Sequence, residues 1–387
     1  MAHGAARIVG VETIAAFLDP SHVALAARLA DIRDRHFSSP DPEGDDDARR
    51  RARESLALLG TEDLLSPAAG GDLRALCLTR EALAFGSPLV DSVVAVQALA
   101  ATTIRLAGRG DQLHWVEDMT RGRMLGAFAM SEPGAGSDVA AIQTSARRDG
   151  DDWVLDGEKH LITNAGIADL YVTFAVTHPG AGSSGLSVFL VPADAPGLGI
   201  IAQRTSVAHP LGRVSFSGCR LPGEALLGEV DNGFRIGMMT LDRIRPSVGA
   251  SACGMAARAL VASLEHAAIP RLSGGTVGDL GLIREKLGRM ATDFEAARLL
   301  TYRAAWLGDR DGGRITVEAA MAKSFATETA QHVVDDAVQI AGGVGLLAGH
   351  PAERLYRAVR AARIYEGTTE IQRLIVAGAL LGRHRAD

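Results

Sequence analysis

Two short segments of the chain hold residues whose types and spacing could support chemistry. Residues 130–138 (MSEPGAGSD) place glycines and serines in a turn, where backbone N–H groups can approach a flat or anionic ligand, although an ordinary Pro-Gly turn has the same composition. Residues 364–373 (IYEGTTEIQR) put Glu366 just before Gly367 and Thr368, and Thr368 is suited to cap a helix. A carboxylate beside a helix start is more often a capping or surface group than a functional one. Neither segment alone decides between these alternatives.

Several other chemistries lose support. The sequence has no GxxxxGK[ST] phosphate loop, no GxSxG elbow and no HExxH, and its 11 histidines never lie at metal-ligand spacing, so we expect no metal site. Gly343, Gly345 and Ala348 match the GxGxxA pattern of dinucleotide-binding turns. Such a turn must follow a strand inside a βαβ unit, whereas residues 334–341 have helical spacing. We therefore reject a nicotinamide site there.

Composition narrows the class of protein. The 387 residues suffice for more than one globular domain. The 40 basic and 46 acidic residues give a net charge of −6, which disfavours nucleic acid as a partner. Three cysteines without a CxxC pair fit a reducing compartment, and no targeting segment or uncharged apolar run of spanning length is visible. These features predict a cytoplasmic protein with no membrane span.

The elements that must position the two segments follow from periodicity. Residues 1–124 show helical spacing of apolar residues, interrupted by the polar stretch 38–51, which we expect to be a solvated loop. Residues 125–232 change to short Val-, Leu-, Phe- and Tyr-rich runs such as 170–176 and 186–191, bounded by turn signals. Residues 233–387 return to long helical segments. We predict an α+β multi-domain fold with an N-terminal helical domain, a central β domain and a C-terminal helical bundle.

Taken together and in this order, the motifs resemble those of the acyl-CoA dehydrogenase family over about two-thirds of the chain. They are MSEPGAGSD (130–138), LDGEKHLITNAG (155–166), LLGEVDNGF (226–234), QIAGGVG (339–345) and RIYEGTTEIQR (363–373). The predicted order of helical, β and helical regions agrees with the family's layout, in which the C-terminal domain is a four-helix bundle. The resemblance implies an oxidoreductase that acts on CH–CH groups in fatty acid metabolism.

Family members bind FAD and remove the α-proton and β-hydride of an acyl thioester, which leaves a trans-2-enoyl thioester. By resemblance, Glu366 is the catalytic base. Because a C–H beside a thioester is a very weak acid, such a base must be held close and have a raised pKa. The backbone N–H of Glu366 and a flavin hydroxyl then meet the charge on the thioester oxygen. Some relatives take the base from another helix, at the position of Ile244, which carries no carboxylate here.

The resemblance also assigns binding residues. Those that match flavin contacts are Phe128, Met130, Ser131, Ser137, Leu161, Thr163, Gln339, Gly342, Gly343, Thr368 and Glu370. Those that match substrate contacts are Ser137, Asp242, Arg245, Tyr365 and Gly367. A surface ion pair on a helix is the alternative for Asp242 and Arg245. In the family, the segment that holds Gln339, Gly342 and Gly343 reaches the FAD of a neighbouring subunit.

The sequence departs from the family pattern at several positions. Leu161 replaces the aromatic residue that usually lies near the flavin. The family's RxxFG segment and a following Gln appear here with Pro270, Ser273 and Gly281 in place of the Arg, Phe and Gln. In relatives that arginine pairs with the FAD pyrophosphate across a subunit boundary, so its loss would weaken flavin binding. Arg271 could compensate by a one-residue shift.

Alternatives for the activity stay open at this point. The favoured hypothesis is a dimeric or tetrameric FAD-dependent acyl-CoA dehydrogenase that passes electrons to an electron-transfer flavoprotein. A second is a subunit of a hetero-oligomer whose partner chain completes the flavin site. A third is a non-catalytic acyl-binding relative, although such a protein needs no base. The thioester carrier is CoA or an acyl carrier protein, and oxygen as acceptor would make the enzyme an oxidase.

Overall fold

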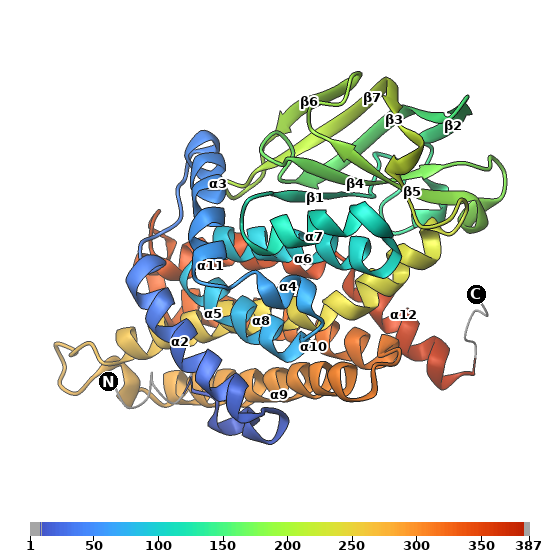
Figure 1. Cartoon of the computed structure of the whole chain (residues 1–387). Coiled ribbons are helices and arrows are strands. Elements are labelled where there is room, and N and C mark those ends of the chain that lie inside the picture. The colour runs from blue at the N-terminus through green and yellow to red at the C-terminus, as the bar shows by residue number, and fades with distance from the viewer. Residues whose placement is uncertain (1–7, 9, 383–387) are drawn as a thin grey trace. The chain divides into compact units, whose positions relative to one another are not determined.

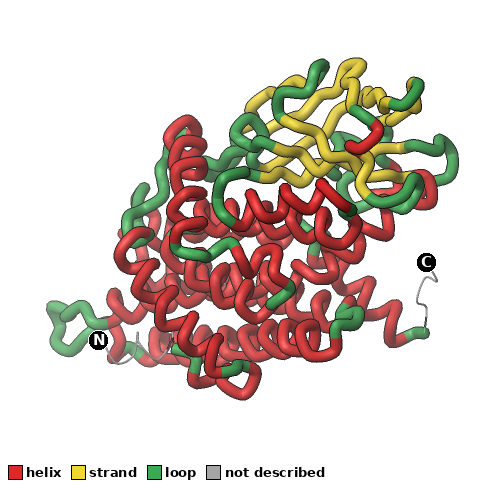
Figure 2. Tube along the Cα trace, in the orientation of Figure 1, coloured by secondary structure: helices red, strands yellow, loops and turns green. Residues whose placement is uncertain are grey.

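The computed structural model describes residue 8 and residues 10–382 of the chain (Figure 1). These residues form two compact units, each assembled from segments that are separate in the sequence. The bundle unit takes the chain up to Asp41, Asp72–Asp91 and the chain from Asp242 onward, and the sheet unit takes Pro42–Gly71 and Ser92–Leu241. Figure 2 shows that the strands are confined to one of the units.

The sheet unit is built on one eight-stranded sheet. Its strands are β1 (Gly126–Ala129), β2 (Ser145–Asp149), β3 (Asp152–Thr163), β4 (Leu170–Val176), β5 (Leu186–Pro192), β6 (Leu198–Gln203), β7 (Leu211–Leu221) and β8 (Leu226–Leu227). They run in the order β6-β7-β3-β2-β4-β5-β8, and β1 pairs in parallel with β4. β4 and β5 are buried along nearly their whole length, which explains their continuous apolar sequence. The aromatic rings of Trp153 and Phe189 meet edge to face in the core of this unit.

A local irregularity in β3 matters for the site. The pairing of β3 with β7 shifts register between Lys159 and Ile162. Leu161, inside this shift, has a left-handed backbone (φ 56°), and its side chain is 54% exposed. Because a β-bulge redirects a side chain out of the regular alternation, it places this leucine on the surface of the unit.

The helices of the sheet unit correct one sequence expectation. They are α3 (Asp45–Thr61), α4 (Ser66–Gly70), α7 (His114–Thr120) and most of α6 (Pro88–Ala107). The prediction of a solvated loop across residues 38–51 is wrong for its second half, because α3 begins at Asp45. Three aspartates fill its first turn, where carboxylates interact favourably with the helix dipole. Arg49 of α3 then donates hydrogen bonds to the carbonyls of Ala165 and Leu211, both at 2.6 Å.

A buried ion pair anchors the glycine-rich segment to β3. Lys159 is fully buried and donates from Nζ to Glu132 Oε1 at 2.7 Å and to the Met130 carbonyl at 3.2 Å. The Glu132 carboxylate also accepts the backbone N–H groups of Gln143 and Thr144. Burial lowers the pKa of Lys159 to about 8, although Glu132 favours the ammonium form. The pair fixes the start of the turn while residues 133, 134 and 136–138 stay exposed.

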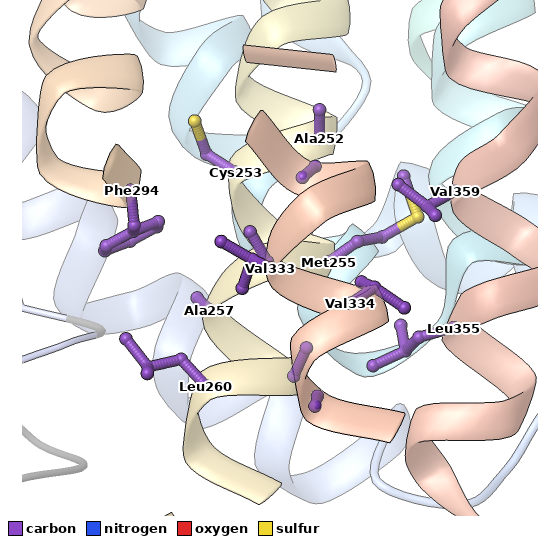
Figure 3. Packing of buried hydrophobic residues seen from close by; sticks show 14 of the residues in the cluster. Ala252, Cys253, Met255, Ala257, Leu260, Phe294, Val333, Val334, Leu355 and Val359 are labelled. Carbon is purple, nitrogen blue, oxygen red and sulfur yellow. The ribbon is translucent and has the colours of Figure 1, made fainter. Parts of the chain in front are cut away.

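The bundle unit contains the long helices that the sequence predicts. They are α2 (Pro20–His36), α5 (Leu73–Gly86), most of α8 (Gly233–Ala267), α9 (Gly281–Asp311), α10 (Thr316–Ala341), α11 (Pro351–Val359) and α12 (Thr369–Leu380). Figure 3 shows the core among them, where Met255 of α8, Phe294 of α9, Val334 of α10 and Leu355 of α11 come together. Many of the core positions are alanines, which allow helices to approach closely. The predicted fold class is confirmed.

The three cysteines are all unpaired and buried. Cys77 and Cys253 lie in the bundle unit, and Cys219 lies on β7 of the sheet unit. Burial raises the pKa of the Cys219 thiol to about 11, and it also raises the pKa values of Cys77 and Cys253. At neutral pH all three are therefore thiols rather than reactive thiolates.

Two helices, Pro88–Ala107 and Gly233–Ala267, are long and apolar enough to cross a membrane by length and composition alone. The first contains an uncharged run, residues 92–104, which is too short to span a membrane, and Asp91 and Arg105 lie at the two ends of that run. Within the protein, 78% and 89% of their most apolar windows are buried, as in the core helices of a globular protein. Length and composition are thus weak evidence for a span.

The anchor of the glycine-rich segment gives a stability prediction. Glu132→Ala leaves the Lys159 ammonium buried with the Met130 carbonyl, and we expect a loss of about 3–5 kcal/mol in the free energy of unfolding. Urea denaturation followed by circular dichroism measures it. The matched control is Glu158→Ala, which breaks a partly exposed pair with Arg213 and should cost at most about 1 kcal/mol. Equal losses in the two variants would contradict the anchoring role.

Candidate active site

The segment that carries Glu366 is a tight left-handed turn in the bundle unit. Glu366 has φ 54° and Gly367 has φ 88°, and Thr368 then caps α12 by accepting the backbone N–H of Ile371. The sequence prediction of a helix cap at Thr368 is confirmed. A left-handed backbone costs a non-glycine residue free energy and persists where the surroundings hold it. The contacts around Glu366 must therefore stabilise this backbone conformation.

Three side chains hold the turn by its carbonyl groups. Arg245 Nε donates to the Glu366 carbonyl at 3.1 Å, and Lys323 Nζ donates to the Gly367 carbonyl at 2.7 Å. Gln372 Nε2 donates to both carbonyls, at 3.2 and 3.1 Å. The donors come from α8, α10 and α12, so the turn is fixed to three helices at once. Glycine is favoured here, because φ 88° is a conformation that other residues rarely adopt and because a Cβ would lie 2.6 Å from Gln372 Nε2.

The carboxylate of Glu366 is left unpaired while its backbone is held. Its Oε2 atom is shielded from solvent and has no hydrogen-bond partner among the described residues. Burial raises the pKa of the Glu366 carboxyl, and the nearby cations Arg80, Lys323 and Arg245 oppose part of this rise. A shielded carboxylate with a raised pKa and a free oxygen is suited to accept a proton.

A second polar cluster lies beside the turn. Arg80 of α5 is buried and forms a bidentate pair with Asp91, at 2.9 and 3.0 Å, and donates to Ser247 Oγ at 2.9 Å. Ser251 Oγ donates to the same carboxylate at 2.6 Å. Pairing with Asp91 raises the pKa of Arg80 despite its burial, so the guanidinium keeps its charge. It thereby supplies permanent positive charge next to Glu366.

Asp242 and Arg245 form a buried pair rather than a pair on the helix surface. Arg245 NH1 donates to Asp242 Oδ1 at 2.7 Å, and both side chains are less than a tenth exposed. Thr316 Oγ1 donates to the other oxygen of Asp242 at 2.5 Å. The pair therefore orients Arg245 toward the Glu366 carbonyl. The structure brings Asp242, Arg245, Tyr365, Glu366 and Gly367 together in this unit.

The remaining residues of the bundle unit that resemble flavin contacts lie elsewhere or at the surface. Gln339, Gly342 and Gly343 are exposed at the C-terminal end of α10. Lys323 and Gln339 are sixteen residues apart on this helix, a separation of about 24 Å. The structure thus separates these three residues from the Glu366 turn. Glu370 is exposed in the first turn of α12, close to the cap at Thr368.

The sheet unit gathers the other predicted flavin residues around β1, β3 and the glycine-rich turn. Phe128 on β1 meets Phe174 edge to face, Met130 is buried, and the Ser131 carbonyl accepts the backbone N–H of His160 at 2.8 Å. Ser137 is exposed in the turn. Leu161 and Thr163 follow on β3. The flavin-binding residues that the sequence predicts in the sheet unit therefore lie in one region of the fold.

Thr163 has a partner that sequence reasoning missed. Its Oγ1 lies 3.1 Å from His209 Nε2. Burial, with a smaller effect of nearby Arg49, lowers the pKa of His209 to about 4. The imidazole is therefore neutral at physiological pH. A histidine in a short loop between two strands gives no signal that it will meet Thr163.

Sequence reasoning also missed four residues around Glu366: Arg80, Asp91, Lys323 and Gln372. A signal existed for two of them, because Asp91 and Lys323 are isolated charges within otherwise apolar helical stretches. The charge of Arg80 is not isolated, because Glu81 follows it directly. Such charges are rarely buried without a functional or pairing reason. Gln372 gave no comparable signal.

The segment that departs from the family pattern forms a small hairpin. Pro270 and Thr276 form an isolated bridge, and the Arg271 N–H donates to the Gly275 carbonyl at 2.9 Å. Leu272 at its tip is fully exposed. Gly281 is the first residue of α9.

The described residues contain no group of three or more His, Cys, Asp or Glu side chains that could hold a metal ion.

Known proteins resemble this chain over most of its length. Residues 127–219 match the family model "Acyl-CoA dehydrogenase, middle domain", and residues 231–381 match "Acyl-CoA dehydrogenase, C-terminal domain". The human mitochondrial short-chain specific acyl-CoA dehydrogenase is 39% identical over 323 residues, which cover 82% of this chain and 78% of the human protein. The chain belongs to the acyl-CoA dehydrogenase family. It is thus an oxidoreductase family member.

Solved structures extend the similarity to the whole fold. Butyryl-CoA dehydrogenase from Megasphaera elsdenii superimposes with a TM-score of 0.87 at 30% identity, covering 94% of this chain and 99% of that one. The prolyl acyl carrier protein oxidase AnaB superimposes with a TM-score of 0.86 at 25% identity, covering 94% of this chain and 99% of that one. The fold therefore occurs in proteins named for a CoA thioester and for a carrier-protein thioester.

The family is FAD-dependent, and the residues of the sheet unit fit a flavin. A Cβ added at Gly134 or Gly136 would meet nothing within 4 Å, so the backbone there is open to a flat ligand. The hydroxyl groups of Ser131 and Thr163 are of the type that hydrogen-bonds a flavin ring edge. Leu161 adds an exposed apolar side chain beside them.

The left-handed turn gives a second prediction. Gly367→Ala would place a Cβ against Gln372 in a backbone conformation that alanine disfavours, and we expect a loss of about 1–3 kcal/mol in the free energy of unfolding. The control is Gly288→Ala inside α9, where a Cβ meets nothing within 4 Å. Because alanine is the better helix former, this variant should gain up to about 1 kcal/mol. A neutral Gly367→Ala would show that the turn is not held as described.

Proposed function

We propose that the protein catalyses FAD-dependent α,β-dehydrogenation of an acyl thioester, with acyl-CoA favoured, to the trans-2-enoyl thioester. The observation that carries this proposal is the Glu366 carboxylate, which has a shielded and unpartnered Oε2 on a turn that three other side chains hold by its backbone. A surface or capping carboxylate has no need of this arrangement. Glu366 is the group that takes the α-proton.

The chain's own residues prepare this proton transfer. Burial raises the pKa of Glu366, which makes its carboxylate a stronger base, while Arg80, Lys323 and Arg245 favour the ionised form and oppose part of this rise. The fixed turn holds the carboxylate in one position, which reduces the entropy lost when substrate and base align. The backbone N–H of Glu366 would donate to the thioester oxygen as negative charge develops there, a contribution of about 3 kcal/mol.

FAD, when bound, supplies the acceptor for the β-hydride. In the sheet unit, Phe128, Met130, Ser131, Ser137 and Thr163 would hold its ring and phosphates. In the bundle unit, Thr368 and Glu370 are the candidates beside the Glu366 turn, and Gln339, Gly342 and Gly343 are the candidates at the other end of α10.

Two carriers of the acyl group are consistent with the comparisons. Similarity to a short-chain specific acyl-CoA dehydrogenase and to butyryl-CoA dehydrogenase supports short acyl-CoA substrates. Similarity to a prolyl acyl carrier protein oxidase supports a carrier-protein thioester as the second candidate. An electron-transfer flavoprotein as acceptor, a homodimer or homotetramer, a hetero-oligomer with a partner chain, and a cytoplasmic location all stay predictions.

The test is anaerobic mixing of the purified flavoprotein with acyl-CoA and acyl carrier protein substrates while the visible flavin absorbance is recorded. We expect bleaching with the true substrate. Glu366→Gln should slow it by about 100- to 10,000-fold with normal flavin content, because the amide cannot take the α-proton. The control, Glu353→Gln on α11, removes a carboxylate paired with Arg357 and should bleach at the normal rate. Normal bleaching in Glu366→Gln would overturn the assignment of the base.

The altered hairpin gives a separate prediction on flavin binding. If Arg271 replaces the arginine that the family has at Pro270, Arg271→Ala should weaken FAD binding by roughly tenfold to a hundredfold. Titration of the apoprotein with FAD, followed by flavin fluorescence, measures the affinity. Arg220→Ala, which removes an exposed arginine paired with Asp149 and Asp152, is the control. Unchanged affinity in Arg271→Ala would favour a partner chain as the source of the missing charge.

A further inference from the structure

Lys323 is a fully buried lysine that lies outside all of the sequence motifs. It lies on α10 among alanines, and Ala319, Ala320, Ala322 and Ala326 around it in the sequence are also buried. A buried ammonium in such surroundings loses its hydration and costs free energy unless it is paired. The Nζ atom of Lys323 donates a hydrogen bond to the Gly367 carbonyl at 2.7 Å. The lysine is therefore directed at the residue that follows Glu366.

The carbonyl that Lys323 holds belongs to the strained part of the turn. Glu366 and Gly367 are consecutive left-handed residues, and the carbonyl of the second points at the ammonium. A hydrogen bond from a charged donor is about twice as strong as one between neutral groups. Gln372 donates to the same carbonyl, but its amide is neutral. Lys323 is thus the charged contact of Gly367 in the described part of the chain.

Lys323 also interacts with the Glu366 side chain through its charge. Among the groups that influence Glu366, Lys323 favours the ionised carboxylate, and Glu366 in turn favours the ammonium of Lys323. Burial nevertheless lowers the pKa of Lys323 to about 8, so the lysine is mostly charged at neutral pH and loses its charge above that value.

We infer that Lys323 is a positioning residue for the base: it fixes the left-handed turn through the Gly367 carbonyl and keeps the Glu366 carboxylate ionised through its charge. This inference rests on the proposed function, because it assigns Lys323 a task in the proton transfer by Glu366. The other charged and titratable groups that interact with the carboxylate or with Lys323 are Arg80, Asp91, Arg245, Glu328, Tyr365 and Glu370.

The sign of the expected pH effect follows from the charges. Loss of the ammonium removes a cation that stabilises the carboxylate, so the pKa of Glu366 must rise. The base is then protonated over a wider range of acidic pH. Proton removal from the substrate needs the carboxylate. As the pH is lowered, its rate should therefore begin to fall at a higher pH than in the wild-type protein.

The first measurement follows the ionisation of Glu366 directly. An infrared pH titration of the full-length protein records the carboxyl band that is absent in Glu366→Gln. Lys323→Gln retains a donor for the Gly367 carbonyl and removes the charge, and Lys323→Met removes both. We expect both variants to titrate at a higher pH than the wild type, and Lys323→Arg to restore the wild-type midpoint. A wild-type midpoint in folded Lys323→Gln overturns the inference, and this variant decides the matter if Lys323→Met fails to fold.

The second measurement isolates proton removal from oxidation. A short 3-thiaacyl-CoA has sulfur in place of the β-carbon and so has no β-hydride to give, and exchange of its α-hydrogens with D₂O is followed by NMR with the holoenzyme. Below the wild-type midpoint, Lys323→Gln should exchange more slowly, by about tenfold for each unit by which the pKa of Glu366 rises. An exchange rate and pH profile equal to those of the wild type would contradict the inference.

Two further variants separate this role from general stability. Lys286→Gln on α9 removes a lysine that pairs with Asp336 and should leave the Glu366 midpoint and the exchange profile unchanged. Gln372→Met removes the neutral donor on the same turn and should slow exchange without moving the midpoint. If the wild-type holoenzyme neither exchanges the α-hydrogens nor bleaches with any thioester, the proposed function fails. If it does both while Lys323→Gln matches it, only the role of Lys323 fails.

Discussion

The carbonyl groups of Glu366 and Gly367 accept hydrogen bonds from Arg245, Lys323 and Gln372, which come from three different helices. These bonds hold two consecutive left-handed residues, a conformation that Glu366 would rarely adopt in an unconstrained chain. All three donors contact the backbone and none contacts the carboxylate. The bundle unit thus uses its buried polar groups to fix the position of a side chain whose own Oε2 stays unpartnered.

Opposing electrostatic effects act on that side chain. Burial favours the neutral acid, and the surrounding cations favour the carboxylate. Each cation is itself held by a different partner: Arg80 by Asp91, Arg245 by Asp242 and Lys323 by the Gly367 carbonyl. Asp91 and Asp242 offset two of the three positive charges, and burial is the larger effect, so the pKa of Glu366 stays above its ordinary value. A tight direct ion pair with Glu366 would have had the opposite result, since it would leave a weak base.

Those parts of the fold and of the candidate site that depend on neighbouring residues could be predicted from the sequence. β4 spans Leu170–Val176 as its β-branched and aromatic residues indicate, and Thr368 caps α12 as its position before an apolar run suggests. The start of α3 was missed because three consecutive aspartates, which begin at Asp45, are as typical of a solvated charge run as of a helix N-terminus. The partners of Glu366 were missed for a different reason. Arg80 and Lys323 are distant in sequence from Glu366, and a single sequence does not show which buried charges meet.

The buried cysteines have a practical consequence for how the two units can be observed. A thiol with a raised pKa and no access to solvent resists alkylation until the structure around it opens. Cys219 belongs to the sheet unit, whereas Cys77 and Cys253 belong to the bundle unit. Mass spectrometry of the cysteine peptides at successive times of alkylation would therefore measure the rate of local opening of each unit separately. No cysteine has to be introduced by mutation.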